Sequence, residues 1–190
     1  MELAAPRYIG ASVQREGVEL LELIKSRRSV RSFRPDPVPR EDLLKMLEAA
    51  RWAPSAGNCQ PWEFVVVTRE DTKRRLAMAA LGQSFIAEAP VVVVVCANIP
   101  RTAWRYGERG ATLYAIQDTA AATQNLLLLA HSMGYGACWV GAFDEDEVRR
   151  ILKIPREVRP VAIVPIGRPA EVPTPPPRIP LGRLIHWESY

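Results

Sequence analysis

The stretch APVVVVVCA, residues 89–97, is the strongest indicator of fold in this 190-residue chain. Five consecutive valines follow Pro90, and a β-branched run without polar alternation is typical of a strand buried on both faces. The apolar run is about half as long as a membrane-spanning helix requires. We therefore expect residues 89–97 to form the central strand of a sheet.

Other segments of strand character lie on both sides of this run. EFVVVT (63–68) is short, apolar and bounded by turn residues, and RPVAIVPIG (159–167) has the same character near the end of the chain. ACWVGAF (137–143) comes directly after a glycine-rich turn and is predicted to be a short strand or a loop.

Helices are expected where apolar residues recur at helical spacing. The predicted helices are 18–26, 40–52, 72–81, 111–133 and 144–152. The fourth is apolar nearly all round, so it should be buried on several sides, in the domain centre or at a subunit interface. Capping-box patterns precede two of the helices, in TRED (68–71) and from Asp144 to Glu147.

Two segments show neither pattern. Residues 98–110 are polar, aromatic and basic, which predicts an exposed loop. Residues 168–190 contain six prolines and end in LGRLIHWESY. A proline-stiffened arm with an apolar tip is expected to dock on a surface, such as that of a second subunit. We assign residues 1–190 to one domain, with 1–17 as an N-terminal extension and 168–190 as the C-terminal arm.

The composition limits the classes of function. A hydrophobic content of 48% with 24% charged residues is typical of a globular protein, and a net charge of +4 is too small for a protein that coats DNA. Three widely spaced cysteines without a CxxC motif favour a reducing compartment and give no metal-ligand spacing. The first ten residues lack the pattern of a signal peptide. We expect a cytoplasmic protein with no metal and with neither a nucleic-acid nor a membrane partner.

The common catalytic motifs are absent. GxGxxG after a strand, the P-loop, HExxH and GxSxG do not occur, and the two histidines argue against a zinc site or a Ser-His-Asp triad. His131 lies within an apolar helix and is interpreted as an interior or interface residue. If the chain is an enzyme, a cofactor is expected to supply the reactive group.

The sequence RRSVRSF (27–33) contains three arginines and two serines at a predicted helix end. Two guanidinium groups with a hydroxyl between them can hold a phosphate through charge-assisted hydrogen bonds. A solvated helix terminus is the alternative, because cations also suit the negative end of the helix dipole, and this segment alone favours that alternative.

Two loops can likewise be interpreted either as ordinary turns or as segments that contact a ligand. PSAGNCQPW (54–62) has the composition of a turn, but its short polar side chains and backbone amides can also edge a planar heterocycle. GYGACWVGAF (134–143) contains glycines that end a helix or that let the backbone approach a ligand closely.

Together these segments resemble the nitroreductase family of FMN-dependent oxidoreductases. The resemblance rests on IKSRRSVRSF (24–33), AARWAPSAGNCQPWEFVVV (49–67), GYGACWVGAF (134–143) and PPPRIPLGRLIHWE (175–188), in that order along the chain. The match extends over about residues 18–188. The middle of the chain is short, which resembles the compact branch of the family and predicts a more open site.

The resemblance implies which residues contact FMN. Those matching the phosphate and ribityl segment are Arg27, Arg28, Ser29, Arg31 and Arg178. Those matching the loop that meets FMN across a dimer interface are Pro54, Ser55, Ala56 and Asn58. Gln83 matches a residue at the pyrimidine edge of the ring. Trp139, Val140 and Gly141 match the segment over the ring, with the Gly141 backbone N–H near N5. No protein side chain is assigned a catalytic role.

The resemblance also implies a fold and an activity. The family fold is α+β, with a mixed central β-sheet flanked by helices, and it forms an intertwined homodimer in which the C-terminal arm is exchanged between subunits. The expected reaction takes hydride from NADH or NADPH to FMN and then to a nitroaromatic, quinone or similar acceptor, in ping-pong order. Trp104, Tyr106 and Arg109 are candidates for contacting this small-molecule acceptor.

Several alternatives stay open at this point. The same fold can carry other flavin chemistry, such as reductive dehalogenation or flavin cleavage. The chain can also be an FMN-binding protein without physiological turnover. An RNA-contacting module is the alternative from a different class, but the arginines are scattered and the aromatic residues lack the pattern of an RNA-binding sheet.

Overall fold

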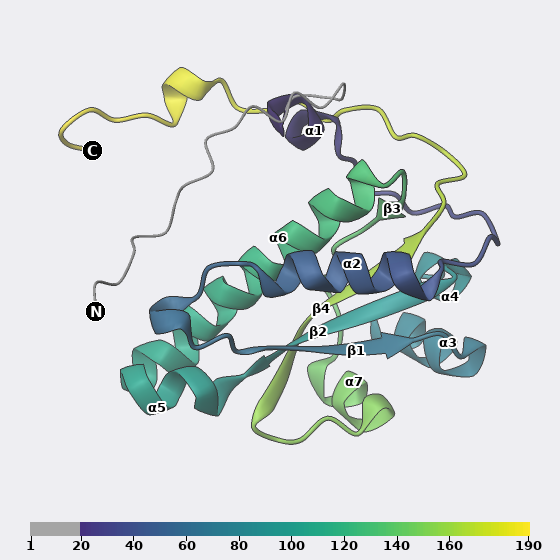
Figure 1. The fold of residues 1–190 in the computed structure, drawn as a ribbon, viewed down its shortest axis with the longest axis horizontal. Coiled ribbons are helices and arrows are strands. Elements are labelled where there is room, and N and C mark those ends of the chain that lie inside the picture. The colour runs from purple at the N-terminus through teal and green to yellow at the C-terminus, as the bar shows by residue number, and fades with distance from the viewer. Residues whose placement is uncertain (1–19) are drawn as a thin grey trace, which may run out of the picture.

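The computed structural model describes residues 20–190 (Figure 1). The N-terminal extension 1–17 and the first two residues of the helix predicted from Val18 lie outside the described residues. One sheet has the strand order β1-β2-β4-β3. Its strands are β1 Trp62–Val67, β2 Val91–Asn98, β3 Gly136–Ala137 and β4 Val158–Gly167. These strands pair antiparallel, and a parallel bridge joins Ser29 to Ala137 at the β3 edge.

Helices cover both faces of the sheet (Figure 1). They are α1 Leu20–Ser26, α2 Arg40–Arg51, α3 Glu70–Ala79, α4 Phe85–Glu88, α5 Ile99–Arg109, α6 Ala115–Ser132 and α7 Glu145–Leu152. Short helical turns are η1 Ala56–Asn58, the π-helical turn η2 Gly110–Tyr114 and η3 Leu181–Arg183. The predicted α+β architecture is confirmed.

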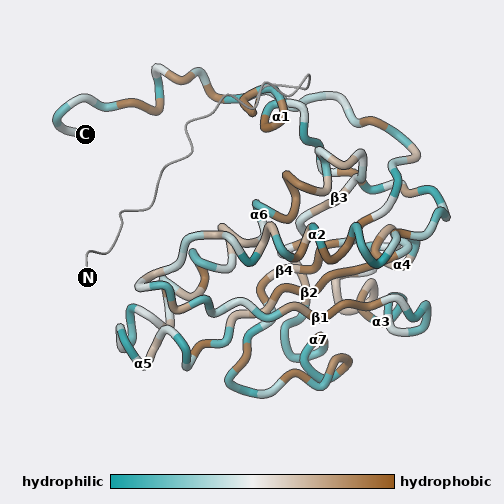
Figure 2. Tube along the Cα trace, in the orientation of Figure 1, coloured by the Kyte–Doolittle hydropathy of each residue, from teal (hydrophilic) through white to brown (hydrophobic). Residues whose placement is uncertain are grey.

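The valine run of β2 belongs to both hydrophobic cores. Val93 and Val95 pack with α2 and α6, whereas Val92 and Val94 pack with α3, α4 and α7. Successive side chains of a strand point to opposite faces, so an uninterrupted apolar run is what a strand covered on both faces needs. Figure 2 shows this run as part of a brown centre under the more hydrophilic helices. The predicted central strand is confirmed.

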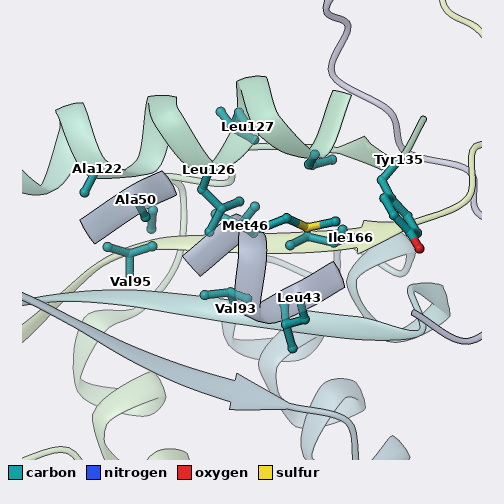
Figure 3. Close-up of a cluster of buried hydrophobic side chains, with 14 of the residues drawn as sticks. Leu43, Met46, Ala50, Val93, Val95, Ala122, Leu126, Leu127, Tyr135 and Ile166 are labelled. Atoms are coloured by element: carbon teal, nitrogen blue, oxygen red, sulfur yellow. The ribbon is translucent and has the colours of Figure 1, made fainter. Parts of the chain in front are cut away.

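The hydrophobic core between α2 and α6 holds α6 against the sheet. Met46 of α2 and Leu126 of α6 are fully buried and lie over Val93 and Ile166 of the sheet (Figure 3). Burying a side chain of this size stabilises the fold by about 1.5–3 kcal/mol. Helix α6 is therefore anchored along its length.

The two predicted capping boxes have different outcomes. Asp144 caps α7, because its side chain accepts a hydrogen bond from the Glu147 backbone N–H, at 2.9 Å. The cap predicted at Thr68 is wrong: α3 begins at Glu70, and Arg69 occupies the N-cap position without a side-chain hydrogen bond. Thr68 lies one residue too early for its hydroxyl to reach the free N–H groups of the first turn.

The loop predicted at 98–110 is also wrong, because this segment forms α5 and enters α6 through the π-helical turn η2. Thr102 and Gly110 are buried, whereas Trp104 and Arg105 are exposed. A Cβ atom at Gly110 would lie 2.5 Å from the Thr102 carbonyl oxygen, so glycine lets the start of α5 pack against this turn. The segment kinks at Gly107, whose φ of 57° lies in the left-handed region.

The C-terminal arm leaves the sheet after Gly167. Its first residues are held by a bridge between Phe33 and Pro169 and by the Ala170 N–H, which donates to the Ser32 carbonyl at 3.0 Å. The arm then runs past α1 and ends away from the sheet (Figure 1). Within the part of the chain that is described, no helix is long and apolar enough to span a membrane.

Candidate functional site

The arginine segment after α1 is fixed against the edge of the sheet. Arg28 Nη1 donates to the carbonyl oxygens of Lys25 at 2.6 Å and of Arg27 at 2.8 Å, which closes the end of α1. The Val30 N–H donates to the Ala137 carbonyl at 3.1 Å, and the Val30 side chain is buried. The arginines on either side of Val30 therefore project from a backbone that is hydrogen-bonded to β3.

These cations line a cavity of about 310 Å³. Its walls are Arg27, Arg28, Ser29 and Arg31 together with the arm residues Pro173, Thr174, Pro176 and Arg178. All five residues predicted for the phosphate are thus brought together, although Arg178 lies far along the chain. The lining contains four guanidinium groups, two hydroxyls and no acidic side chain, so it fits a multiply charged oxyanion such as the FMN phosphate.

The electrostatics of the cavity favour an anion. Burial lowers the pKa of Arg27, and the positive charges of Arg28 and Arg178 lower it further, whereas Cys138 acts in the opposite direction. The same field reaches His131, whose pKa is lowered by burial and then by Arg27 and Arg28. Like charges crowd here without a carboxylate in the cavity wall, and a dianion would relieve that repulsion.

Gly136 and Cys138 form the floor under the arginine segment. A Cβ atom at Gly136 would lie 2.7 Å from Val30 Cβ, so only glycine allows the segment to approach β3 this closely. Burial raises the pKa of the Cys138 thiol, and its neighbours Arg31, Ser29 and Arg27 oppose the rise. Cys138 is therefore a buried neutral thiol beside the cavity, without the exposure that a nucleophile needs.

The segment predicted to lie over the flavin ring continues directly from this floor. Val140 pairs with Ile163 through backbone hydrogen bonds of 2.9 and 3.0 Å, whereas Gly141 is exposed with open space at its Cα. Trp139 is partly exposed. Gln83 Nε2 donates to the Ala80 carbonyl at 2.8 Å and to the Ala142 carbonyl at 3.3 Å. The structure therefore brings Gln83 next to Ala142, directly after the 139–141 segment.

The loop at 54–58 lies elsewhere and is held from three sides. Ser55 Oγ accepts from the Gln60 N–H at 3.0 Å, and Asp118 Oδ1 of α6 accepts from the Ala56 N–H at 3.0 Å. Arg105 Nη1 of α5 donates to the Gly57 carbonyl at 3.0 Å. Pro54 and Asn58 are exposed at this loop, and Asn58 has a φ of 57°.

The three acceptor-contact candidates lie on α5, and one of them, Tyr106, lies against that loop. A Cβ atom at Gly57 would lie 2.4 Å from the Tyr106 hydroxyl oxygen, which shows how closely Tyr106 approaches the loop. Arg109 Nε donates to the Tyr114 hydroxyl at 2.9 Å. Trp104 is 89% exposed and contributes an aromatic surface to solvent.

The candidate residues thus form two groups at opposite ends of α6. The loop group is held by Asp118, whereas the cavity group lies near His131, whose Nε2 is 2.9 Å from Ser26 Oγ. Thirteen residues separate these two contacts on α6, which at a rise of 1.5 Å per residue is about 20 Å. Within one chain, the 54–58 loop and the cation cavity therefore lie at opposite ends of this helix.

Several residues at the site were not identified from the sequence. Thr174 enters the cavity wall because the arm folds back, and no local pattern indicates that path. Asp118 is buried in α6 with one carboxylate oxygen lacking a partner among the described residues. Burial raises its pKa, while the Ala56 N–H opposes the rise. The one feature of the sequence that could have identified Asp118 is that it is a carboxylate in a largely apolar helix.

A model of the nitroreductase family matches residues 24–85 and 77–168, which include the arginine segment, the 54–58 loop and the ring segment. The chain belongs to the nitroreductase family. The resemblance seen in the sequence is therefore confirmed.

Similar proteins extend over most of this nitroreductase-family chain. An NADH dehydrogenase of Thermus thermophilus is 39% identical over 188 residues, with 85% of this chain and 92% of that protein covered. An FMN reductase [NAD(P)H] of Bacillus subtilis is 28% identical, covering 90% of this chain and 74% of that protein. The structure of the NADPH:FMN oxidoreductase of Vibrio harveyi complexed with NAD+ matches with a TM-score of 0.82 and 27% identity, covering 90% of this chain and 77% of that one.

Proposed function

We propose that the chain takes hydride from NADH or NADPH onto FMN and passes it to a nitroaromatic, a quinone or a similar small acceptor. The chain is an NAD(P)H-dependent flavin oxidoreductase of the nitroreductase family. When bound, FMN supplies the atom that accepts and releases hydride. The observation that carries the residue assignments is the cavity lined by Arg27, Arg28, Ser29, Arg31 and Arg178.

The cavity residues hold the cofactor by its phosphate. A charge-assisted hydrogen bond contributes about 1.5–3 kcal/mol, so several of them retain FMN through repeated turnovers. Gln83 donates to the Ala142 carbonyl, next to the exposed Gly141. We assign Gln83 to the pyrimidine edge, and Trp139, Val140 and Gly141 to the face near N5, where amide donors stabilise the extra electron density of the reduced ring.

A second copy of the chain supplies the remaining contacts. Pro54, Ser55, Ala56 and Asn58 lie about 20 Å along α6 from the cavity group, and we assign them to the FMN of the partner chain. A homodimer places this loop of one protomer against the ring segment of its partner. Trp104, Tyr106 and Arg109 then lie beside the loop, where they contact the hydride acceptor.

The hydride donor and the acceptor use one place in turn. If only one planar molecule stacks on the flavin at a time, donor and acceptor are not bound together, and the order is ping-pong. The oxidised nicotinamide leaves before the acceptor enters.

The visible spectrum of the purified protein tests the central claim. We expect flavin absorbance, or its appearance with stoichiometric uptake when FMN is added. NADH or NADPH should bleach it under anaerobic conditions. After the oxidised nucleotide is removed, a quinone or nitroaromatic should restore it, which separates the two half-reactions. A protein that takes up no FMN contradicts the proposal, whereas FMN that no nicotinamide donor bleaches indicates a passive FMN-binding protein.

A further inference from the structure

The C-terminal arm connects the cation cavity of its own chain to a surface far from the body. Thr174 and Arg178 in its first half line the cavity together with Arg27 and Arg28. From Ile179 onward every residue is exposed, and this part runs past α1 and away from the sheet (Figure 1). One continuous segment therefore contacts the phosphate site at its base and reaches outward at its tip.

The base of the arm has few other attachments. The last backbone hydrogen bonds to the body join Arg34 to Arg168 at 2.8 Å and Ala170 to Ser32 at 3.0 Å. After Ala170, the backbone hydrogen bonds recorded for the described chain are local to the arm, such as Arg183 N to the Pro180 carbonyl at 2.9 Å. Beyond Ala170, the path of the arm therefore depends on the contacts that its residues Thr174 and Arg178 make at the cavity.

The charges at the cavity repel the base of the arm. Arg178 Nη1 donates to the carbonyls of Pro176 at 3.4 Å and Pro177 at 3.2 Å, both within its own segment. Among the ion pairs of residues 20–190, none includes Arg27, Arg28 or Arg178. Three guanidinium groups without a carboxylate push apart, whereas a dianion between them draws all three inward.

We propose that the arm is a latch operated by the phosphate of FMN. The phosphate draws Arg178 toward Arg27 and Arg28, which fixes the path of the arm and lets residues 179–190 dock on a second copy of the chain. The latch rests on the proposed FMN binding and homodimer, and it adds that cofactor affinity and dimer strength depend on one another. Such a linkage is reciprocal, so a tighter dimer also binds FMN more tightly.

The composition of the arm suits this transmission. Pro173, Pro175, Pro176, Pro177 and Pro180 restrict the backbone on both sides of Arg178, and proline-rich segments act as semi-rigid spacers. Because the proline-rich base of the arm is stiff, fixing the position of Arg178 also fixes the direction in which residues 179–190 leave the cavity. The tip presents apolar side chains to solvent, with Leu181 70% and Trp187 82% exposed, and Figure 2 shows brown stretches along it. A second copy is the occupant that buries them in a homodimer.

Riboflavin separates the phosphate from the rest of FMN, because it has the same ring and ribityl chain but lacks the phosphate. We would measure tryptic cleavage between Arg183 and Leu184 in protein saturated with FMN, saturated with riboflavin, or free of flavin. FMN should slow cleavage at least about fivefold relative to riboflavin, the lower end of typical coupling between sites. Sedimentation should show a dimer dissociation constant lowered by a similar factor.

Arg178→Gln tests the latch itself. This variant, saturated with FMN, should be cleaved at Arg183 as fast as the riboflavin-bound wild type. Arg156→Gln, on the exposed loop after α7, is the matched control and should keep full protection. Equal protection by FMN and riboflavin, or protection retained in Arg178→Gln, overturns the latch while FMN binding stands. Absence of any bound flavin, read from absorbance, contradicts the proposed function and the latch with it.

Discussion

Arg27 and Arg31 face the cavity from different environments. Arg27 is half-buried, and its pKa is lowered by burial and by its cationic neighbours, whereas Arg31 is exposed with its guanidinium 5.9 Å from the centre of the Phe85 ring. A buried cation gains more from an anion than one that water already solvates. The two side chains should therefore contribute unequally to FMN binding.

We expect Arg27→Ala to weaken FMN binding by about 10- to 100-fold and Arg31→Ala by about 10-fold, the range of charge-assisted hydrogen bonds. Titration of flavin fluorescence at two salt concentrations measures both losses. Arg75→Ala, an exposed arginine of α3, should leave the affinity unchanged. Riboflavin affinity should be equal in all variants, and unchanged FMN affinity in both cavity variants would place the phosphate elsewhere.

His131 provides a pH-dependent prediction for the flavin-free protein. Burial, Arg27 and Arg28 lower its pKa in the folded chain below the value of 6.5 that it has when unfolded. The unfolded state then binds more protons, so the contribution of His131 to stability is present above pH 6.5 and is lost as the pH falls through the folded pKa.

Urea unfolding between pH 7.5 and 5 measures this effect. His131→Gln should show a smaller loss of unfolding free energy over that range than the wild type, because a neutral side chain replaces the titrating one. His186→Gln, in the exposed arm, should follow the wild type. An identical pH dependence in His131→Gln and the wild type would show that His131 does not titrate differently on folding.

At the scale of elements, the contact between the arginine segment and β3 depends on Gly136. Gly136→Ala places a Cβ atom 2.7 Å from Val30 Cβ, so the segment or the strand has to move. Overpacking of this kind costs about 1–3 kcal/mol of stability. The displaced segment should also lose FMN affinity.

Thermal unfolding and FMN titration of Gly136→Ala test this contact. Gly182→Ala is the matched control, since a Cβ atom there meets nothing within 4 Å. It should change stability by less than about 0.5 kcal/mol. A Gly136→Ala variant with unchanged stability and affinity would show that Val30 and β3 are not rigidly packed.

The helices and strands also show how much of the fold can be predicted from the sequence. The central strand was predictable because β2 is apolar from Val91 to Ala97 and follows directly on Pro90. Helix α5 was missed, although Pro100 in its first turn is a usual helix-start signal. Its polar, aromatic and basic composition indicated an exposed loop, and the packing of Gly110 on Thr102 that makes the helix possible is tertiary.

The candidate site divides in a similar way. The arginines of 27–31 are visible in the sequence, but on their own they favour a solvated helix end over a phosphate site. Only the fold brings Arg178 and Thr174 to them, because the arm turns back after Ala170. Long-range closure of this kind has no local signature, so it entered through the family resemblance and not through residue spacing.

At the scale of the whole molecule, the described chain leaves apolar surface that a monomer does not bury. Leu20 and Leu21 of α1 are more than half exposed, as are Ile179, Leu181 and Trp187 of the arm. The loop at 54–58 and the cation cavity also lie at opposite ends of α6. Both features are explained if the arm and the loop of one protomer contact its partner.

Removing residues 179–190 tests that arrangement. The truncated chain keeps Arg178 and both hydrophobic cores, so its far-UV circular dichroism should match that of the full chain. Its dimer should be weaker by about 10-fold or more, since burial of even one large apolar side chain contributes about 1.5–3 kcal/mol.

Sedimentation equilibrium across a range of concentrations measures the loss. The double variant Leu181→Ser/Trp187→Ser should reproduce much of it at full chain length, whereas Glu188→Gln should not. If the partner completes the flavin site, as proposed, the truncated protein should release FMN on dilution at concentrations where the full-length protein retains it. A truncated chain that stays dimeric and yellow at those concentrations would show that other surfaces hold the two subunits together and that the arm serves its own chain alone.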